Sequence, residues 1–252
     1  MTRQLSAAGC ALLVGVTDSP RLSGSYGMWK VSAGLLLMII SFGALSDPQG
    51  EADRVVTLPE PKRAGPMALE QALETRRSVR RYAEEVPDLN AIAQLAWAAQ
   101  GVSDLGRGLR TAPSAGATYP MEVDLLVRRA RGLSPGVWRY RPDEHVLVRR
   151  LDAAPGEAVV QASLGQAAVA RAPLVVALSA VEARTAHRYG ERAARYVHME
   201  AGHVAQNIYL QATALGLGTV AIGAFDDEAL ARALELGPGE RPLYLLPIGY
   251  RR

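Results

Sequence analysis

Cysteine is almost missing from this sequence: Cys10 is the single one among 252 residues. A lone thiol excludes disulfides within the chain, thiol redox pairs and zinc ribbons, all of which need more than one cysteine. Any redox chemistry must therefore be carried by a bound cofactor. His198 and His203 lie five positions apart, off the four-residue spacing of a metal pair on one helical face, so we expect no metal site.

The chain also has a low net charge and few phenylalanines. The net charge is +3, only two phenylalanines occur, and no basic stripe is interleaved with aromatic side chains. This composition argues against a nucleic-acid-binding protein. With 49% hydrophobic and 21% charged residues, the chain has ordinary globular composition and enough length for one large domain or two small ones.

An uncharged run of 15 residues, 31–45, is somewhat shorter than the roughly 20 residues that span a membrane. Read from Met28, with Lys30 before the run and small residues at its end, it matches a signal peptide; an uncleaved anchor fits about equally well. The acidic residues that follow place the main body outside the cytoplasm, in the cell envelope. If the run reflects a misplaced gene start, we expect a cytoplasmic protein instead. Residues 1–46 are thus predicted to form an N-terminal extension.

The chain after this run alternates between helical and strand-like patterns. Residues 47–65 contain three prolines among charged residues and are predicted to be a linker, so the folded domain begins near Val55 or at Pro66. Hydrophobic periodicity and capping residues predict helices at 66–76, 88–101, 157–171, 188–216 and 226–237. Alternating or continuous apolar stretches predict strands at 121–127, 137–140, 145–149, 173–180 and 242–250.

Two segments have the composition of a binding site. At the predicted end of the first helix, Arg76–Arg81 places four arginines and one serine within six positions. Guanidinium groups offer fixed forks of donors that suit a phosphate, although a short basic run is also common as a solvated turn. Residues 110–120 are dominated by small side chains, which leave room for a flat ligand beside the backbone; a plain connector is the alternative. The Gly216-Leu-Gly218 triplet is no dinucleotide loop, because it ends a helix and leads into a strand.

Four segments in this order resemble the FMN-dependent nitroreductase family, and within it the SagB/ThcOx-type dehydrogenase branch. They are RRSVRRY (76–82), PSAGATYP (113–120), GERAARYVHMEAGHVAQNIYLQATALGLGTVAIGAFDD (190–227) and RPLYLLPIGY (241–250). The resemblance covers roughly residues 55–252. It implies an α+β fold, with a central, mostly antiparallel sheet sandwiched by helices in an FMN-binding domain at 66–252. It also implies a homodimer with FMN at the subunit interface.

The resemblance further implies a function and a set of cofactor contacts. Hydride would pass by a ping-pong mechanism from NAD(P)H or an organic donor to a nitro compound, a quinone or an azoline-type heterocycle, on a small molecule or a peptide. One backbone N–H of the segment 222–224 would reach flavin N5, and the segment 113–115 would come from the partner subunit. The cofactor contacts that the resemblance implies are Arg76, Arg77, Ser78, Arg80, Pro113, Ser114, Ala115, Gln166, Ile222, Gly223, Ala224 and Arg251 or Arg252.

One position departs from the azoline-oxidising relatives. They resemble one another in a Lys-Tyr pair ahead of the long helix, where this chain has Arg188-Tyr189. Arginine stays protonated and is a poor base, so Tyr189 is the candidate catalytic acid or base. The same departure, with the hydrophobic run, leaves a second hypothesis: an envelope-anchored flavin-binding or assembly protein without turnover.

Overall fold

The computed structural model describes residues 54–154 and 156–252. The predicted extension at 1–46, with its hydrophobic run, and the start of the predicted linker lie outside these residues. Within the described residues, none of the helices combines the length and the apolar character that crossing a bilayer requires.

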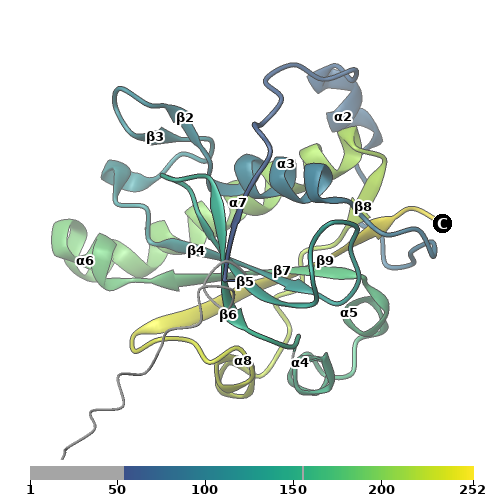
Figure 1. Cartoon of the computed structure of the whole chain (residues 1–252). Coiled ribbons are helices and arrows are strands. Elements are labelled where there is room, and N and C mark those ends of the chain that lie inside the picture. The colour runs from purple at the N-terminus through teal and green to yellow at the C-terminus, as the bar shows by residue number, and fades with distance from the viewer. Residues whose placement is uncertain (1–53, 155) are drawn as a thin grey trace, which may run out of the picture. The chain divides into compact units, whose positions relative to one another are not determined.

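A seven-stranded sheet organises the described residues (Figure 1), and all of its neighbouring strands pair antiparallel. In spatial order its strands are β1 (Val55–Thr57), β6 (Val146–Leu151), β5 (Gly136–Arg141), β4 (Met121–Val127), β7 (Leu174–Val181), β9 (Glu240–Tyr250) and β8 (Leu217–Thr219). Strand β7 is buried on both faces along nearly its whole length. This explains its continuous apolar sequence and confirms the predicted central strand.

Helices cover both faces of the sheet, which confirms the predicted α+β sandwich (Figure 1). One face packs against α3 (Leu89–Gln100) and α7 (Ala193–Ala214). The other face packs against three short helices, α4 (Gly156–Ala162), α5 (Ala167–Arg171) and α8 (Asp227–Ala233).

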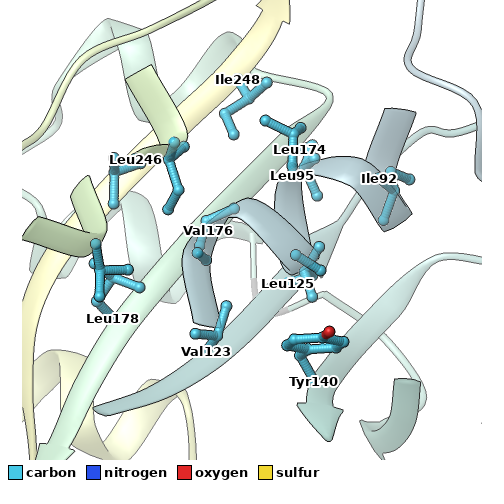
Figure 2. Packing of buried hydrophobic residues seen from close by; sticks show 14 of the residues in the cluster. Ile92, Leu95, Val123, Leu125, Tyr140, Leu174, Val176, Leu178, Leu246 and Ile248 are labelled. Atoms are coloured by element: carbon cyan, nitrogen blue, oxygen red, sulfur yellow. The ribbon is translucent and has the colours of Figure 1, made fainter. Parts of the chain in front are cut away.

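The larger core lies between the sheet and the α3–α7 layer (Figure 2). Ile92 and Leu95 of α3 face the sheet residues Leu125 and Val176, and all four are at most 2% exposed. Full burial of such a side chain contributes roughly 1.5–3 kcal/mol. Buried residues of α7 belong to the same core, which therefore holds α7 against the sheet. Helix α7 carries much of the site described below.

Capping predicted two helix starts correctly. Asp88 accepts a hydrogen bond from the Ala91 N–H at 2.9 Å, and Asp226 accepts one from the Ala229 N–H at 2.8 Å. Each carboxylate satisfies a backbone donor that the first turn of a helix leaves free.

Four predicted helices differ from the structure. The helix predicted at 226–237 already ends at Ala233, as α8. The helix predicted at 157–171 is interrupted by Leu164 and Gly165, whose φ values of +59° and +68° end α4 before α5 begins. The helix predicted from Arg188 is split at Gly190, φ +54°, into α6 (Ala183–Tyr189) and α7. The first helix, α2 (Leu69–Thr75), begins three residues after Pro66.

The second half of the predicted linker belongs to the sheet. Strand β1 pairs with β6, Leu58 is 5% exposed, and the Lys62 N–H donates to Gln94 Oε1 at 2.8 Å. Of the two expected starting points, the fold therefore begins at Val55. The segment 101–110, which follows α3, contains a small hairpin of β2 (Val102–Asp104) and β3 (Leu109–Arg110).

Candidate functional site

The basic segment, Arg76–Arg81, leaves α2 as an extended stretch and runs beside β8. The Val79 N–H donates to the Thr219 carbonyl at 2.8 Å, and Ser78 forms a parallel bridge with Thr219. This close approach requires a glycine, because a Cβ at Gly218 would lie 2.6 Å from Val79 Cβ. The backbone that carries the arginines is therefore fixed against the edge of the sheet.

Tyr209 of α7 joins this segment to the chain after β8. Its ring lies 5.2 Å from the guanidinium carbon of Arg76, its hydroxyl lies 3.2 Å from Ser78 Oγ, and the same hydroxyl accepts a hydrogen bond from the Ala221 N–H at 2.8 Å. The sequence reasoning missed Tyr209, because a polar position on a long helix does not reveal which segments it contacts.

The next three residues, Ile222–Ala224, form the other wall of the same region. Ile222 is buried and exchanges two backbone hydrogen bonds with Leu245, whereas Gly223 and Ala224 are exposed. Gln166, just ahead of α5, donates from Nε2 to the Ala224 carbonyl at 2.9 Å. The structure thus brings the predicted positions Arg76–Ser78, Ile222–Ala224 and Gln166 into one continuous region.

The other predicted arginines are used in different ways. Arg77 Nη1 donates to the carbonyls of Glu74 and Arg76 at 2.7 Å each, and so caps the end of α2. Arg251 donates to the Leu217 carbonyl and to Thr213 Oγ1 at 3.1 Å each, and so holds the end of α7 to β8. Arg80 is exposed and makes no side-chain hydrogen bond to the described residues, so its donors are available to a ligand.

The small-residue loop, residues 110–120, is held by the middle of α7. The Pro113 carbonyl lies 3.1 Å from His203 Nδ1, which must carry a proton to donate to it. Ser114 Oγ accepts a hydrogen bond from the Tyr119 N–H at 3.0 Å. A single 3-10 turn, Ala115–Ala117, follows.

Tyr189 lies against this loop. Gly116 adopts φ +60°, and a Cβ there would lie 2.7 Å from the Tyr189 hydroxyl, so only glycine fits. Arg188 Nη1 donates to the Gly116 carbonyl at 3.3 Å, and the Tyr189 ring packs edge-on against Tyr196 with centroids 5.0 Å apart. The candidate catalytic tyrosine and the small-residue loop are therefore neighbours.

The two groups of predicted residues lie on different sides of α7 within one chain. His203 holds the small-residue loop through Pro113, and Tyr209 holds the basic segment. Six helical residues separate His203 from Tyr209, which corresponds to about one and two-thirds turns and about 9 Å of rise. The two side chains therefore point about 120° apart around the helix axis, so the loop and the basic segment lie on different sides of α7.

A comparison with protein families decides the family. The model described as "Nitroreductase family" matches residues 73–250. The chain belongs to the nitroreductase family. A candidate nitroreductase from Methanocaldococcus jannaschii is 48% identical over 181 residues, which cover 72% of this chain and 90% of that protein.

Solved structures of nitroreductases share the fold. The crystal structure of a candidate nitroreductase from Ralstonia eutropha JMP134 matches with a TM-score of 0.70 and 30% identity, over 79% of this chain and 90% of that one. A chain of the Escherichia coli microcin synthetase McbBCD complex, with truncated pro-MccB17 bound, matches with a TM-score of 0.61 and 20% identity, over 84% of each chain. At that identity the second likeness concerns the fold alone. Within the described ranges, no three His, Cys, Asp or Glu side chains gather as a metal site would require.

Proposed function

We propose that this nitroreductase-family chain is an FMN-dependent oxidoreductase that works as a homodimer. The observation that carries the proposal is the continuous region formed by the basic segment, Ile222–Ala224 and Gln166, with Tyr209 between its parts. In this proposal NADH, NADPH or an organic donor binds and leaves before the acceptor enters the same site, as a ping-pong mechanism requires.

The residues present fit FMN. Arg80 and Arg76 supply guanidinium donors, and Ser78 supplies a hydroxyl, which together suit a phosphate and a ribityl chain. Gly223 is exposed and its missing side chain leaves the Tyr244 ring as the nearest neighbour, at 3.5 Å from an ideal Cβ position, so a flat ring can approach the backbone there. Bound FMN would supply the hydride-accepting chemistry that no side chain of this protein provides.

The chain's own residues would direct that chemistry. A guanidinium group beside the pyrimidine edge stabilises the negative charge that gathers there on reduction, and a backbone N–H from Ile222–Ala224 orients the reacting nitrogen. Tyr189, which lies against the small-residue loop, is the candidate that would hold or deliver a proton.

We propose that the second half of the site comes from a partner copy. The different directions of His203 and Tyr209 on α7 support this, because the small-residue loop then serves a site other than the one on its own basic segment. Helix α2 also has an apolar surface that a partner chain could cover. Leu69 is 60% exposed and Leu73, one turn later, is 51% exposed.

We assign the chain to the SagB/ThcOx-type branch on the order of its four motifs, and the microcin synthetase likeness agrees at the level of the fold. The acceptor is a nitro compound, a quinone or an azoline-type heterocycle. Arg188 argues against the last of these, because its guanidinium cannot take up a proton and instead donates to the Gly116 carbonyl. We also propose that residues 31–45 attach the protein to the envelope or direct its export.

Visible absorption of the purified full-length protein tests this function. We expect a flavin spectrum after FMN is added, bleaching by NADH or NADPH without air, and repeated turnover when a quinone or a nitro compound is supplied. A colourless protein that gains no flavin band would contradict the proposal.

A second candidate function is an envelope-anchored flavin-binding or assembly protein without turnover, and Arg188 is the observation that favours it. The same experiment separates the two. Flavin that binds but is not bleached by any donor would support the second function, and repeated turnover would eliminate it.

A further inference from the structure

One cavity of this protein lies apart from the proposed cofactor region. It has a volume of about 380 Å³ and is formed by both ends of the small-residue loop, the start of β4, the turn between β5 and β6, and α6. Among the described residues that line it, none is a predicted cofactor contact. Cavities of this size commonly hold small organic ligands.

The guanidinium group of Arg110 is the buried charge of this cavity. The Arg110 side chain is 15% exposed, and among residues 54–154 and 156–252 the only carboxylate within salt-bridge distance is that of Asp143, at 3.9 Å. Asp143 is itself 79% exposed, so solvent screens its charge. Within the same residues the guanidinium group donates no hydrogen bond; only the backbone N–H of Arg110 does. A cation buried to this extent is costly without a bonded partner, and an anionic ligand removes that cost.

Tyr119 holds the Arg110 side chain in place. Its ring centre lies 4.6 Å from the guanidinium carbon, and its hydroxyl accepts a hydrogen bond from the Arg110 backbone N–H at 3.2 Å. Tyr119 adopts φ +45°, a left-handed conformation that is unfavourable for a residue with a side chain. Arg184 supports this conformation, because its Nη1 donates to the Tyr119 carbonyl at 3.2 Å. The free donors of Arg110 are therefore presented in a fixed position, which lowers the entropic cost of binding.

The other charges around the cavity leave its inner end positive. Arg184 forms a salt bridge with Glu122, so these two charges offset each other. The turn 141–144 carries one arginine and two acidic side chains, all exposed to solvent, which screens them. Glu200, which is buried on α7, lies beyond salt-bridge distance of Arg110, so its charge offsets that of Arg110 only in part.

Apolar side chains complete the walls of the cavity. Met121, Val123 and Tyr140 line it, and each of them is 2% exposed. The Tyr140 hydroxyl already has a partner, since it lies 2.8 Å from His145 Nδ1. The cavity thus combines one buried cation with apolar walls, and this combination suits an apolar molecule that carries a single anionic group.

We propose that this cavity binds an organic carboxylate with a small apolar body, with its two oxygens on the Arg110 guanidinium group. Guanidinium presents parallel N–H donors that match both oxygens of a carboxylate. Because Arg110 and Tyr119 belong to the small-residue loop, the ligand would rest against that loop and outside the FMN region. The inference therefore does not depend on FMN binding.

Saturation-transfer NMR of benzoate and benzamide with the full-length protein, without added FMN, tests the inference. The two probes have nearly the same shape, and only benzoate carries a charge. We expect saturable binding of benzoate and at least about tenfold weaker binding of benzamide, because the charge-assisted hydrogen bonds are lost. Equal affinities for the two probes, or no saturable binding of benzoate at millimolar concentrations, would overturn the inference.

Variants of three arginines locate the bound benzoate. Arg110→Gln should lower the benzoate affinity to about that of benzamide, whereas Arg107→Gln should bind like wild type, since Arg107 is exposed and pairs with Asp104 inside the same hairpin. Benzoate that is held by the basic segment instead would be lost in Arg80→Ala and kept in Arg110→Gln, which would overturn the inference. The comparison of benzoate with benzamide on the wild-type protein decides the question even if Arg110→Gln does not fold.

Discussion

Tyr209 connects two segments that the sequence motifs mark separately. Its hydroxyl is the hydrogen-bond partner of the Ala221 N–H and lies next to Ser78. Tyr209→Phe keeps the ring beneath Arg76 and removes this hydroxyl, leaving the Ala221 donor without its partner. We expect a loss of about 1–3 kcal/mol in the free energy of unfolding, together with weaker FMN binding.

Urea unfolding and fluorescence titration with FMN measure the two effects. Tyr196→Phe is the matched control, since among residues 54–154 and 156–252 the Tyr196 hydroxyl accepts only from the exposed Arg192 side chain, at 3.1 Å. Unchanged stability and flavin affinity in Tyr209→Phe would show that the hydroxyl does not hold the two segments together.

Glu240 predicts how the stability of the protein depends on pH. Burial alone would raise its pKa, but the hydrogen bonds and charge of Arg139 lower it below the ordinary glutamate value. A lowered carboxyl pKa gives stability that is present above the unfolded value, about 4.3, and is lost as pH falls through the folded one. Because Arg139 keeps its salt bridge of 2.5 Å with Asp124, Glu240→Gln should cost about 1.5–3 kcal/mol at pH 7 and progressively less below pH 4.

Urea unfolding at a series of pH values checks this expectation. A deficit in Glu240→Gln that is the same at pH 7 and at pH 3 would mean that the Arg139–Glu240 pair does not contribute as an ion pair.

At the scale of elements, β8 and the basic segment depend on one glycine. The missing side chain of Gly218 lets Val79 approach, so Gly218→Ala must push the basic segment away from the sheet. Overpacking of this kind typically costs about 1–3 kcal/mol, and the displaced arginines should bind FMN more weakly.

Thermal unfolding and FMN titration test this prediction against Gly65→Ala, where an added Cβ has no neighbour within 4 Å. If Gly218→Ala behaved like Gly65→Ala in both measurements, the close approach of Val79 would have no consequence for the site.

Elements that depend on local signals were predictable from the sequence, and those set by distant partners were not. The caps Asp88 and Asp226 act on the next turn of chain, so both helix starts were found. Strand β1 exists because of β6, about 90 residues later, and its own sequence ends among prolines. The break between α4 and α5 requires Leu164 at positive φ, which the residue type disfavours.

The same distinction applies to the site. The motifs located the candidate residues, but Gln166, Tyr209 and Ala224 come together only through tertiary packing. Arg77 and Arg251 show the limit of a motif, since the structure has their side chains bonded to helix and strand ends.

At the scale of the whole molecule, the account requires two chains. The small-residue loop and the basic segment are held by different sides of α7, and Leu69 and Leu73 leave an apolar face exposed on α2. Each chain would thus give its basic segment to one site and its small-residue loop to the other. This arrangement predicts that two different defects, one in each chain, fall together in one of the two sites and leave the other site intact.

Co-expression of Arg80→Ala with Gly116→Val tests this arrangement most directly. Arg80→Ala should weaken FMN binding by about 10–150-fold, since a charge-assisted hydrogen bond contributes roughly 1.5–3 kcal/mol. Gly116→Val should displace the loop, because its side chain would meet Tyr189. A mixed dimer then carries both defects in one site and neither in the other. The account predicts that purified mixed dimers bind one FMN per two chains with wild-type affinity; mixed dimers that bind FMN no better than either parent variant would contradict it.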